Sequence, residues 1–248
     1  MGAIGKPERA SQNRVIQLFQ NELGYTYLGD WENEVRTQPI EEDLLLTYLT
    51  KNNRYSIELA QKAVDALVKA ATNLSDDLYE ANKEVYKLLR YGVTVREELG
   101  QPKETVWLID WKHPISNDFA VAEEITVAGK HKKRPDVVLF VNGIAIGVIE
   151  LKRSKVGVEE GIRQNLDNQK PEFIEKYFTT MQLVMAGNDT QGLRYGTIET
   201  SEKYYLKWKE ESHKEFDYLL DKHISQLCEK SRILELVHDF VVFDKGVK

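Results

Sequence analysis

Three charged residues at one end of an apolar hairpin form the part of the sequence best suited to chemistry. Asp136 precedes the apolar run 137–141, and Glu150 and Lys152 close the run that begins at Ile144. Charged groups at the edge of a core are unfavourable unless they are paired or bound to a metal ion. Two carboxylates and one amine in this position are suited to hydrolysis assisted by a divalent metal ion.

The two apolar runs are predicted to pair as a β-hairpin. Asn142 and Gly143 stand between them, and Asn-Gly is a strong signal for a two-residue turn because both residues accept positive φ angles. Both runs are continuous rather than alternating, which is typical of strands covered on both faces. The hairpin is therefore expected inside a larger sheet, with the charged residues at its open end.

The register of this hairpin decides whether the two carboxylates share a face. With a plain two-residue turn, Asp136 and Glu150 would lie on opposite faces. A β-bulge would instead pair Asp136 with Val148 and make Glu150 its diagonal neighbour, with Cβ atoms roughly 7–8 Å apart. We therefore expect a bulge at Gly143 or Gly147, because glycine accepts the backbone that a bulge requires.

These residues can be assigned roles in a metal site. Hard oxygen ligands select Mg²⁺, for which Mn²⁺ can substitute, so Asp136 and Glu150 are predicted metal ligands, with the backbone carbonyl of Leu151 as a third. Lys152 shares a face with Glu150, where it would orient the attacking water or stabilise charge that develops on a phosphate. An ordinary salt bridge between these charges is the alternative interpretation.

Charge is distributed unevenly along the chain. The net charge of −6 argues against a general nucleic-acid binder, but residues 130–155 hold seven Lys and Arg against two acidic residues, a local excess of five. The basic residues predicted to contact DNA phosphates are Lys132, Lys133, Arg134, Arg153 and Lys155. A solvated loop without a ligand is the alternative for residues 130–134.

A family resemblance joins these observations. Pro135-Asp136 followed by Glu150-Leu151-Lys152 matches the PD-(D/E)xK nuclease signature. The flanking segments 82–93, 108–111, 117–119 and 192–197 resemble the N-terminal endonuclease region of the R (restriction) subunit of type I restriction–modification enzymes. The resemblance covers nearly the whole chain, and it implies an α/β restriction-endonuclease-like core that hydrolyses DNA phosphodiesters.

The resemblance also implies partners. Double-stranded DNA would be the substrate, and its sequence would be selected by the methyltransferase and specificity subunits of the restriction complex. In the full subunit the nuclease region precedes an ATP-driven translocase. This chain contains no G-x-x-x-x-G-K-[S/T] segment, so ATP would act only through a motor region outside it.

Glutamines provide further candidates for supporting roles. Gln169 and Phe173 fall where relatives carry a Q-x-x-x-Y motif, with Phe in place of Tyr, so Gln169 is a candidate to position a water or a phosphate. Exposure on a helix surface is the alternative. Gln12, Gln17 and Glu22 on the first predicted helix are polar candidates for reaching the site, and solvent exposure is the role we expect of them.

The remaining segments are predicted to surround the hairpin with helices and strands. The first 91 residues are expected to form a helical cap on the core, residues 92–210 the nuclease core with a central mixed sheet, and residues 211–248 C-terminal helices that lead toward the motor region. Ser56 and Ser75 are placed to cap two of the helices. Helices are predicted over 7–23, 41–49, 56–71, 75–89, 158–168, 216–227 and 233–240, and further strands over 93–96, 105–109, 119–127, 182–186 and 195–198.

Composition indicates the compartment. The chain has 42% hydrophobic and 30% charged residues, which is typical of a soluble globular protein, and it contains no apolar run of 18 residues. The first residues lack the apolar region of a signal peptide, and the single Cys228 excludes an internal disulfide. We expect a cytoplasmic protein without membrane contact.

Two other functions fit parts of the pattern. A nuclease-like fold can serve as a docking module between the motor and the methyltransferase, in which case the carboxylates are incidental. A repair exonuclease of the same superfamily is the second alternative. Binding of Mg²⁺ or Mn²⁺ would separate a nuclease from a docking module, since docking requires no metal.

Overall fold

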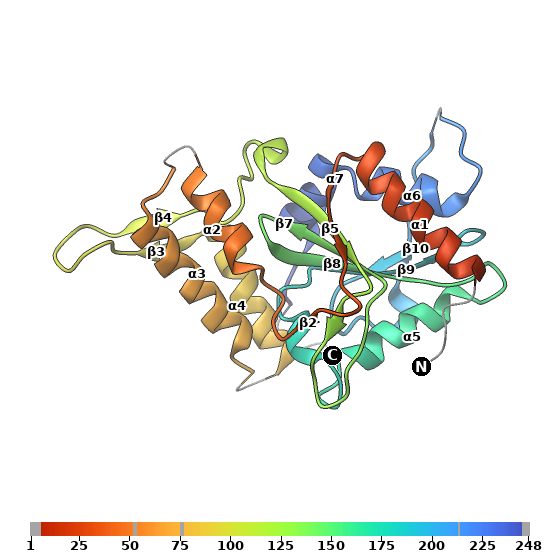
Figure 1. The fold of residues 1–248 in the computed structure, drawn as a ribbon, viewed down its shortest axis with the longest axis horizontal. Helices are drawn as coiled ribbons and strands as arrows, with labels where there is room; N and C mark the ends of the chain where they lie inside the picture. Colours follow the sequence, from red (N-terminus) through yellow and green to blue (C-terminus); the bar gives the residue numbers. More distant parts are fainter. Residues whose placement is uncertain (1–5, 52–53, 75–76, 213, 245–248) are drawn as a thin grey trace.

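The fold is described by a computed structural model over residues 6–51, 54–74, 77–212 and 214–244 (Figure 1). A central mixed sheet flanked by helices confirms the predicted α/β class. Seven strands within these ranges form the sheet, in the order β1–β5–β7–β8–β9–β10–β11. Their bounds are Thr26–Asp30 (β1), Phe119–Glu123 (β5), Val137–Val141 (β7), Ile144–Leu151 (β8), Leu183–Asn188 (β9), Gly192–Gly196 (β10) and Leu206–Lys207 (β11).

Strands β7 and β8, the predicted hairpin, lie in the middle of this sheet. β7 is antiparallel to both β5 and β8, whereas β8 and β9 run parallel. Every residue of β7 and β8 is buried, which explains why their sequences are continuously apolar except at Glu150. The hairpin is therefore covered on both faces, as its sequence predicts.

Different helices cover the two faces of the sheet (Figure 1). On one face, α1 (Lys6–Asn21), α6 (Leu219–Leu227) and α7 (Lys230–Glu235) share a hydrophobic cluster with alternate residues of β7, such as Leu139. On the other face, α5 (Val158–Asn168) packs Val158 and Ile162 against Val138 and Val148. Asp136 and Glu150 thus lie at the end of a strand pair held between α1 and α5.

An N-terminal helical layer stands beside the sheet. It contains α2 (Glu42–Thr50), α3 (Ile57–Thr72) and α4 (Leu78–Tyr91), so the predicted helices are confirmed with ends that differ by a few residues. The Ser56 hydroxyl caps α3 by accepting a hydrogen bond from Leu59 N at 3.2 Å. Ser75 lies outside the described residues, and the Asp77 carboxylate caps α4. A small hairpin, β3 (Val93–Val95) and β4 (Glu104–Val106), follows the layer.

Several predicted elements differ in extent from the observed ones. The strand predicted over 119–127 is broken into β5 and β6 (Thr126–Val127), because Glu124 has a φ angle of 53°. The helix predicted over 216–227 begins only at Leu219. The helix predicted over 233–240 is observed as α7 followed by the π turn Leu236–Phe240 (η5). Elements that were not predicted include β2 (Val35–Arg36), β11 and the 3₁₀ turns Pro114–Ser116 (η2), Glu175–Phe178 (η3) and Glu202–Tyr204 (η4).

The turn of the central hairpin is confirmed. Asn142 and Gly143 have φ angles of 53° and 82°, the positive values that a tight two-residue turn requires. The Asn142 side chain donates to the carbonyl of Leu108 at 2.9 Å and to the buried Asn117 side chain at 2.8 Å. These contacts place Asn117 in the turn structure at the end of the hairpin away from the carboxylates.

The hairpin contains a bulge, as predicted, but its position at Gly143 or Gly147 and its effect on the register were predicted wrongly. The pairs are Val137–Ile149, Val138–Val148 and Leu139–Gly147 on one side of it, and Phe140–Ala145 and Val141–Ile144 on the other. Ile146, next to Gly147, is therefore the extra residue, and the register shifts opposite to the expected direction. Asp136 precedes the first pair and lies level with Glu150, not with Val148.

The predicted helical cap packs directly against the sheet. One hydrophobic cluster runs from α2–α4 into the sheet, so the described part of the chain shows continuous packing between the predicted cap and core. The boundaries predicted after residues 91 and 210 stay predictions. None of the described helices has the length and apolar character needed to cross a membrane.

Candidate active site

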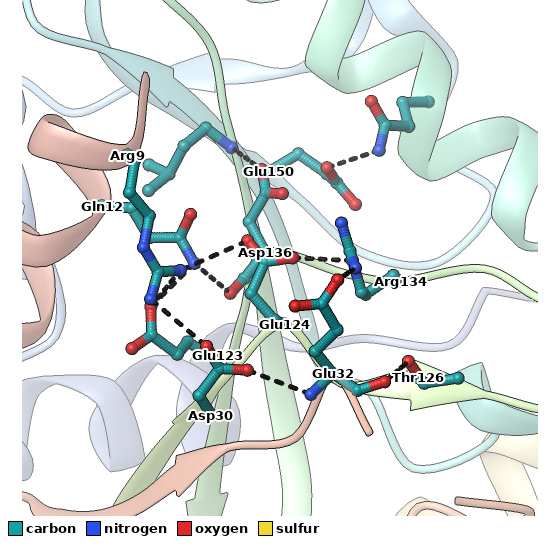
Figure 2. A network of polar contacts seen from close by, with 12 residues as sticks. Arg9, Gln12, Asp30, Glu32, Glu123, Glu124, Thr126, Arg134, Asp136 and Glu150 are labelled. Carbon is teal, nitrogen blue, oxygen red and sulfur yellow. Dashed lines mark hydrogen bonds and ion pairs between the residues drawn. The ribbon is translucent and has the colours of Figure 1, made fainter. Parts of the chain in front are cut away.

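Asp136 and Glu150 meet at the end of the sheet where β7 begins and β8 ends, which we call the carboxylate edge. Figure 2 shows the two side chains next to each other. Glu150 is fully buried, and Asp136 is half-buried. One carboxylate oxygen of Asp136 accepts a hydrogen bond from the backbone N–H of Leu151 at 2.7 Å. This bond joins the two strands directly beside Glu150 and holds the carboxylates together.

The proximity of the carboxylates changes the ionisation of Glu150. Burial raises the pKa of the Glu150 carboxyl well above its ordinary value of 4.5, and the charge of Asp136 raises it further. The Lys152 ammonium, with Nζ at 3.8 Å from Glu150 Oε2, acts in the opposite direction. Ionised Glu150 is therefore only partly balanced by the protein, and a bound cation would stabilise it further.

Lys152 is connected to Glu150 through a glutamine of α5. Lys152 Nζ donates to Gln164 Oε1 at 2.8 Å, and Gln164 Nε2 donates to Glu150 Oε2 at 2.7 Å. Asn168, one helical turn further on, places its amide nitrogen 3.5 Å from the other Glu150 oxygen. The structure thus brings together the three residues of the predicted motif and adds two amides from α5.

The glutamine that bonds to both Lys152 and Glu150 is Gln164, whereas the predicted Gln169 has other partners. Gln169 is buried at the end of α5, where it donates to the carbonyl of Asn165 at 3.0 Å and accepts from Glu199 N at 2.6 Å. These contacts hold the helix end and a loop. Gln164 lies on the same side of α5 as Gly161, where an added Cβ would be 3.4 Å from Glu150 Cβ. The helical period predicts that these two residues share a side, but it does not show that this side faces Glu150.

A second set of polar contacts reaches the carboxylate edge from α1 (Figure 2). Gln12 is 1% exposed, so the expected solvent exposure of this residue was wrong, whereas Gln17 and Glu22 do lie at the surface. Gln12 Nε2 donates to Glu123 Oε2 at 2.8 Å and approaches the backbone carbonyl of Asp136 at 3.4 Å. The sequence signal that was available is its position four residues before the apolar Ile16, on the buried side of the helix.

Arg134, a predicted DNA contact, forms ion pairs with carboxylates of the protein itself. Its guanidinium pairs with Glu124 at 2.7 Å and with Glu32. Glu124 is buried, and burial raises the pKa of its carboxyl, while a hydrogen bond from Gln12 and the charge of Arg134 lower it. Arg9 approaches both Glu124 and Glu123, so the ion pairs continue along the edge beside Asp136.

The other predicted DNA contacts lie at the same end of the sheet. Lys132 is exposed and Lys133 is half-buried in the segment that leads into β7. Lys133 Nζ lies 4.1 Å from the centre of the Phe173 ring. Arg153 and Lys155 are exposed in the turn that follows β8. Because β7 starts and β8 ends at the carboxylate edge, both basic segments border it.

The chemistry of the donors fits Mg²⁺ or Mn²⁺ with few protein ligands. Within the described residues, no group of three or more His, Cys, Asp or Glu is arranged to hold a metal ion. Asp136 and Glu150 supply two adjacent carboxylates, and Mg²⁺ characteristically binds through one or two carboxylates and keeps several waters. The buried and incompletely balanced charge of Glu150 supports this fit.

A mixed sheet with paired carboxylates at the end of its central hairpin is consistent with a PD-(D/E)xK-like nuclease core. Residues 6–203 match the family described as the type I restriction enzyme R protein N terminus, and the chain belongs to this family. The resemblance inferred from the sequence is thereby confirmed.

Relatives in this family are named as endonuclease subunits. The chain is 30% identical over 203 residues to the type I restriction enzyme HindI endonuclease subunit of Haemophilus influenzae, covering 76% of this chain and 19% of the relative. It is 27% identical over 244 residues to the putative type I restriction enzyme MjaVIIIP endonuclease subunit of Methanocaldococcus jannaschii, covering 93% and 22%. The chain thus spans about a fifth of the length of these relatives.

Proposed function

We propose that this chain is the nuclease region of a type I restriction enzyme R subunit and that it hydrolyses DNA phosphodiesters with the help of a divalent metal ion. The observation that carries the proposal is the register of the central hairpin. It places Asp136 level with Glu150, with Lys152 Nζ 3.8 Å from the latter. Family membership supports the same activity, since the relatives are named endonuclease subunits.

The residues of the carboxylate edge would have different roles in this reaction. Asp136, Glu150 and the Leu151 carbonyl would hold Mg²⁺ or Mn²⁺, which when bound supplies an acidified water and neutralises phosphate charge. Lys152 would orient the attacking water or stabilise the charge that develops on the phosphate. Gln164, bonded to both Lys152 and Glu150, would keep the amine and the carboxylate in fixed relative positions.

Family membership supports a proposal for the substrate and partners. Double-stranded DNA would bind across the carboxylate edge, where Lys132, Lys133, Arg153 and Lys155 can reach phosphates. Arg134 would contribute from its carboxylate pairs. Methyltransferase and specificity subunits would select the DNA sequence, and ATP would act only through a motor region outside this chain.

The test is the loss of metal binding together with the loss of cleavage. Asp136→Ala and Glu150→Ala should each abolish Mn²⁺ binding in calorimetry, and DNA cleavage when the variant subunit is assembled into the restriction complex. Circular dichroism should stay near wild type, because neither residue is an apolar core residue. Cleavage by either variant at the wild-type rate would overturn the proposal, and a wild-type chain that binds no Mn²⁺ would favour a docking module.

A further inference from the structure

Gln12 is an unusual residue for the buried face of α1. Its buried neighbours one and two turns further along the helix, Val15, Ile16 and Phe19, are apolar and pack on the sheet. An amide buried to this extent is unfavourable unless it is hydrogen-bonded. A glutamine in this position therefore depends on specific partners, and those partners indicate what it does.

The partners of Gln12 lead to the main chain of Asp136. Gln12 Nε2 donates to Glu123 Oε2 at 2.8 Å and lies 3.4 Å from the carbonyl oxygen of Asp136. The same carbonyl accepts a hydrogen bond from Glu124 N at 3.0 Å. Figure 2 shows the Gln12 amide lying between Glu123 and Asp136.

Glu123 is itself held in one orientation. Its second oxygen accepts a hydrogen bond from the Tyr27 hydroxyl at 2.6 Å, and the Arg9 guanidinium pairs with the first oxygen at 3.1 Å. Glu123 is 5% exposed, so these contacts are largely shielded from water. Glu123 therefore gives the Gln12 amide one preferred position.

Asp136 requires such support because the sheet does not enclose it completely. The first residue of β7 with a partner in both neighbouring strands is Val137, which faces Glu123 of β5 and Ile149 of β8. Asp136 lies one residue before that pair. The Leu151 N–H fixes its carboxylate from β8, and the Gln12 amide approaches its peptide from α1.

We propose that Gln12 is a positioning residue for Asp136 and thereby sets the affinity of the carboxylate edge for a divalent metal ion. This inference rests on the proposed function, since it takes Asp136 as a metal ligand. Partners that orient metal ligands typically change metal affinity by about 10- to 100-fold when they are removed. An anchoring role for α1 alone would change stability and leave metal affinity unaltered.

The test compares two methionine substitutions on one helix. Gln12→Met keeps the length of the side chain and removes the amide with every hydrogen bond that it makes, and Gln17→Met makes the same change at an exposed position of α1. In Mn²⁺ calorimetry, Gln12→Met should weaken binding about 10-fold, the low end of the range for orienting partners. Gln17→Met should bind as wild type. Cleavage by Gln12→Met should recover at saturating Mn²⁺, because Lys152 is intact.

A second variant keeps the inference testable if Gln12→Met fails to fold. Tyr27→Phe removes one hydroxyl from a half-buried residue and frees one side of Glu123. It should weaken Mn²⁺ binding in the same direction and by less. Unchanged Mn²⁺ affinity in whichever of these variants fold would overturn the positioning role.

Asp136→Ala in the same titration separates the two proposals. If it binds Mn²⁺ like wild type, the proposed function fails, and the positioning role fails with it. If Asp136→Ala loses Mn²⁺ while Gln12→Met and Tyr27→Phe bind normally, only the positioning role is wrong.

Discussion

The helical layer α2–α4 and the carboxylate edge bury side chains of opposite kinds. In the layer, the buried residues are mainly apolar, as with Leu45, Leu67 and Leu89, and the polar Asn82 of α4 is buried among them with its amide bonded to backbone carbonyls. At the edge, Gln12 and Glu150 are buried just as completely, and each depends on hydrogen bonds or ion pairs. Side chains in the two regions are therefore similarly buried, but burying the polar groups of the edge is electrostatically much less favourable.

This difference indicates a division of labour. Apolar burial is non-directional and stabilises the fold roughly in proportion to the area removed from water. Buried polar groups are directional, so they stabilise one geometry only when every partner is present. We infer that the layer supplies stability and that the edge supplies a fixed arrangement of charges, which four predictions test.

The largest expected effect is a loss of stability in the layer. Leu67→Ala in α3 removes a fully buried side chain and should lower the free energy of unfolding by about 2–5 kcal/mol. Mn²⁺ affinity of the folded protein should be unchanged. Ile57→Ala, at a position that is 51% exposed at the start of the same helix, is the control and should change little. Denaturant unfolding and calorimetry measure the two quantities, and a weakened metal site would contradict the division.

The next largest effect is on catalysis at the edge. Lys152→Ala should still bind Mn²⁺ but cleave DNA at least ~100-fold more slowly, a loss typical of groups that transfer protons or stabilise developing charge. If Lys152 merely balances Glu150, the variant should instead be unstable, and added metal should restore both stability and cleavage. Recovery of cleavage at saturating Mn²⁺ would therefore rule out the catalytic role.

A third prediction concerns the pH dependence of the metal-free protein. The pKa of Glu150 is raised in the fold, so its contribution to stability is fully present below about pH 4.5 and is lost as the pH rises through the raised pKa. Glu150→Gln should therefore melt a few degrees above wild type at pH 8 and show no gain at pH 4.5. Mn²⁺ should raise the melting temperature of wild type only.

The control for this pH series is Glu172→Gln, which changes an exposed carboxylate. It should follow the wild-type melting curve at every pH. A Glu150→Gln variant that is less stable than wild type at pH 8 without metal would show that the Glu150 charge is well compensated by the protein.

The smallest expected effect lies at the border of the edge. Changing Lys132 and Lys133 together to Ala should weaken DNA binding and reduce the slope of log K against log salt by about one to two units. Stability and Mn²⁺ affinity should be unaltered, because neither residue belongs to the carboxylate network. An unchanged slope would make this segment a solvated loop.

Local sequence was sufficient to predict much of the fold and the central part of the candidate site. The continuous apolar runs and Asn142-Gly143 predicted the buried hairpin, because turn geometry and strand burial depend on neighbouring residues. The helices of the layer were predicted within a few residues, since their apolar period and caps are also local. Asp136, Glu150 and Lys152 could be named because the hairpin brings together residues that are near in sequence.

Only the tertiary structure decided how the site is held. The bulge falls at Ile146 because β8 must pair with β7 on one side and β9 on the other, so the register depends on the whole sheet. Gln12 reaches the backbone carbonyl of Asp136 and Gln164 reaches the Glu150 carboxylate because α1 and α5 pack on opposite faces of that sheet. The helical period can place a glutamine on the buried side of its helix, but it does not identify the partners of the amide. For Gln12 the partner Glu123 lies more than 100 residues away in the sequence.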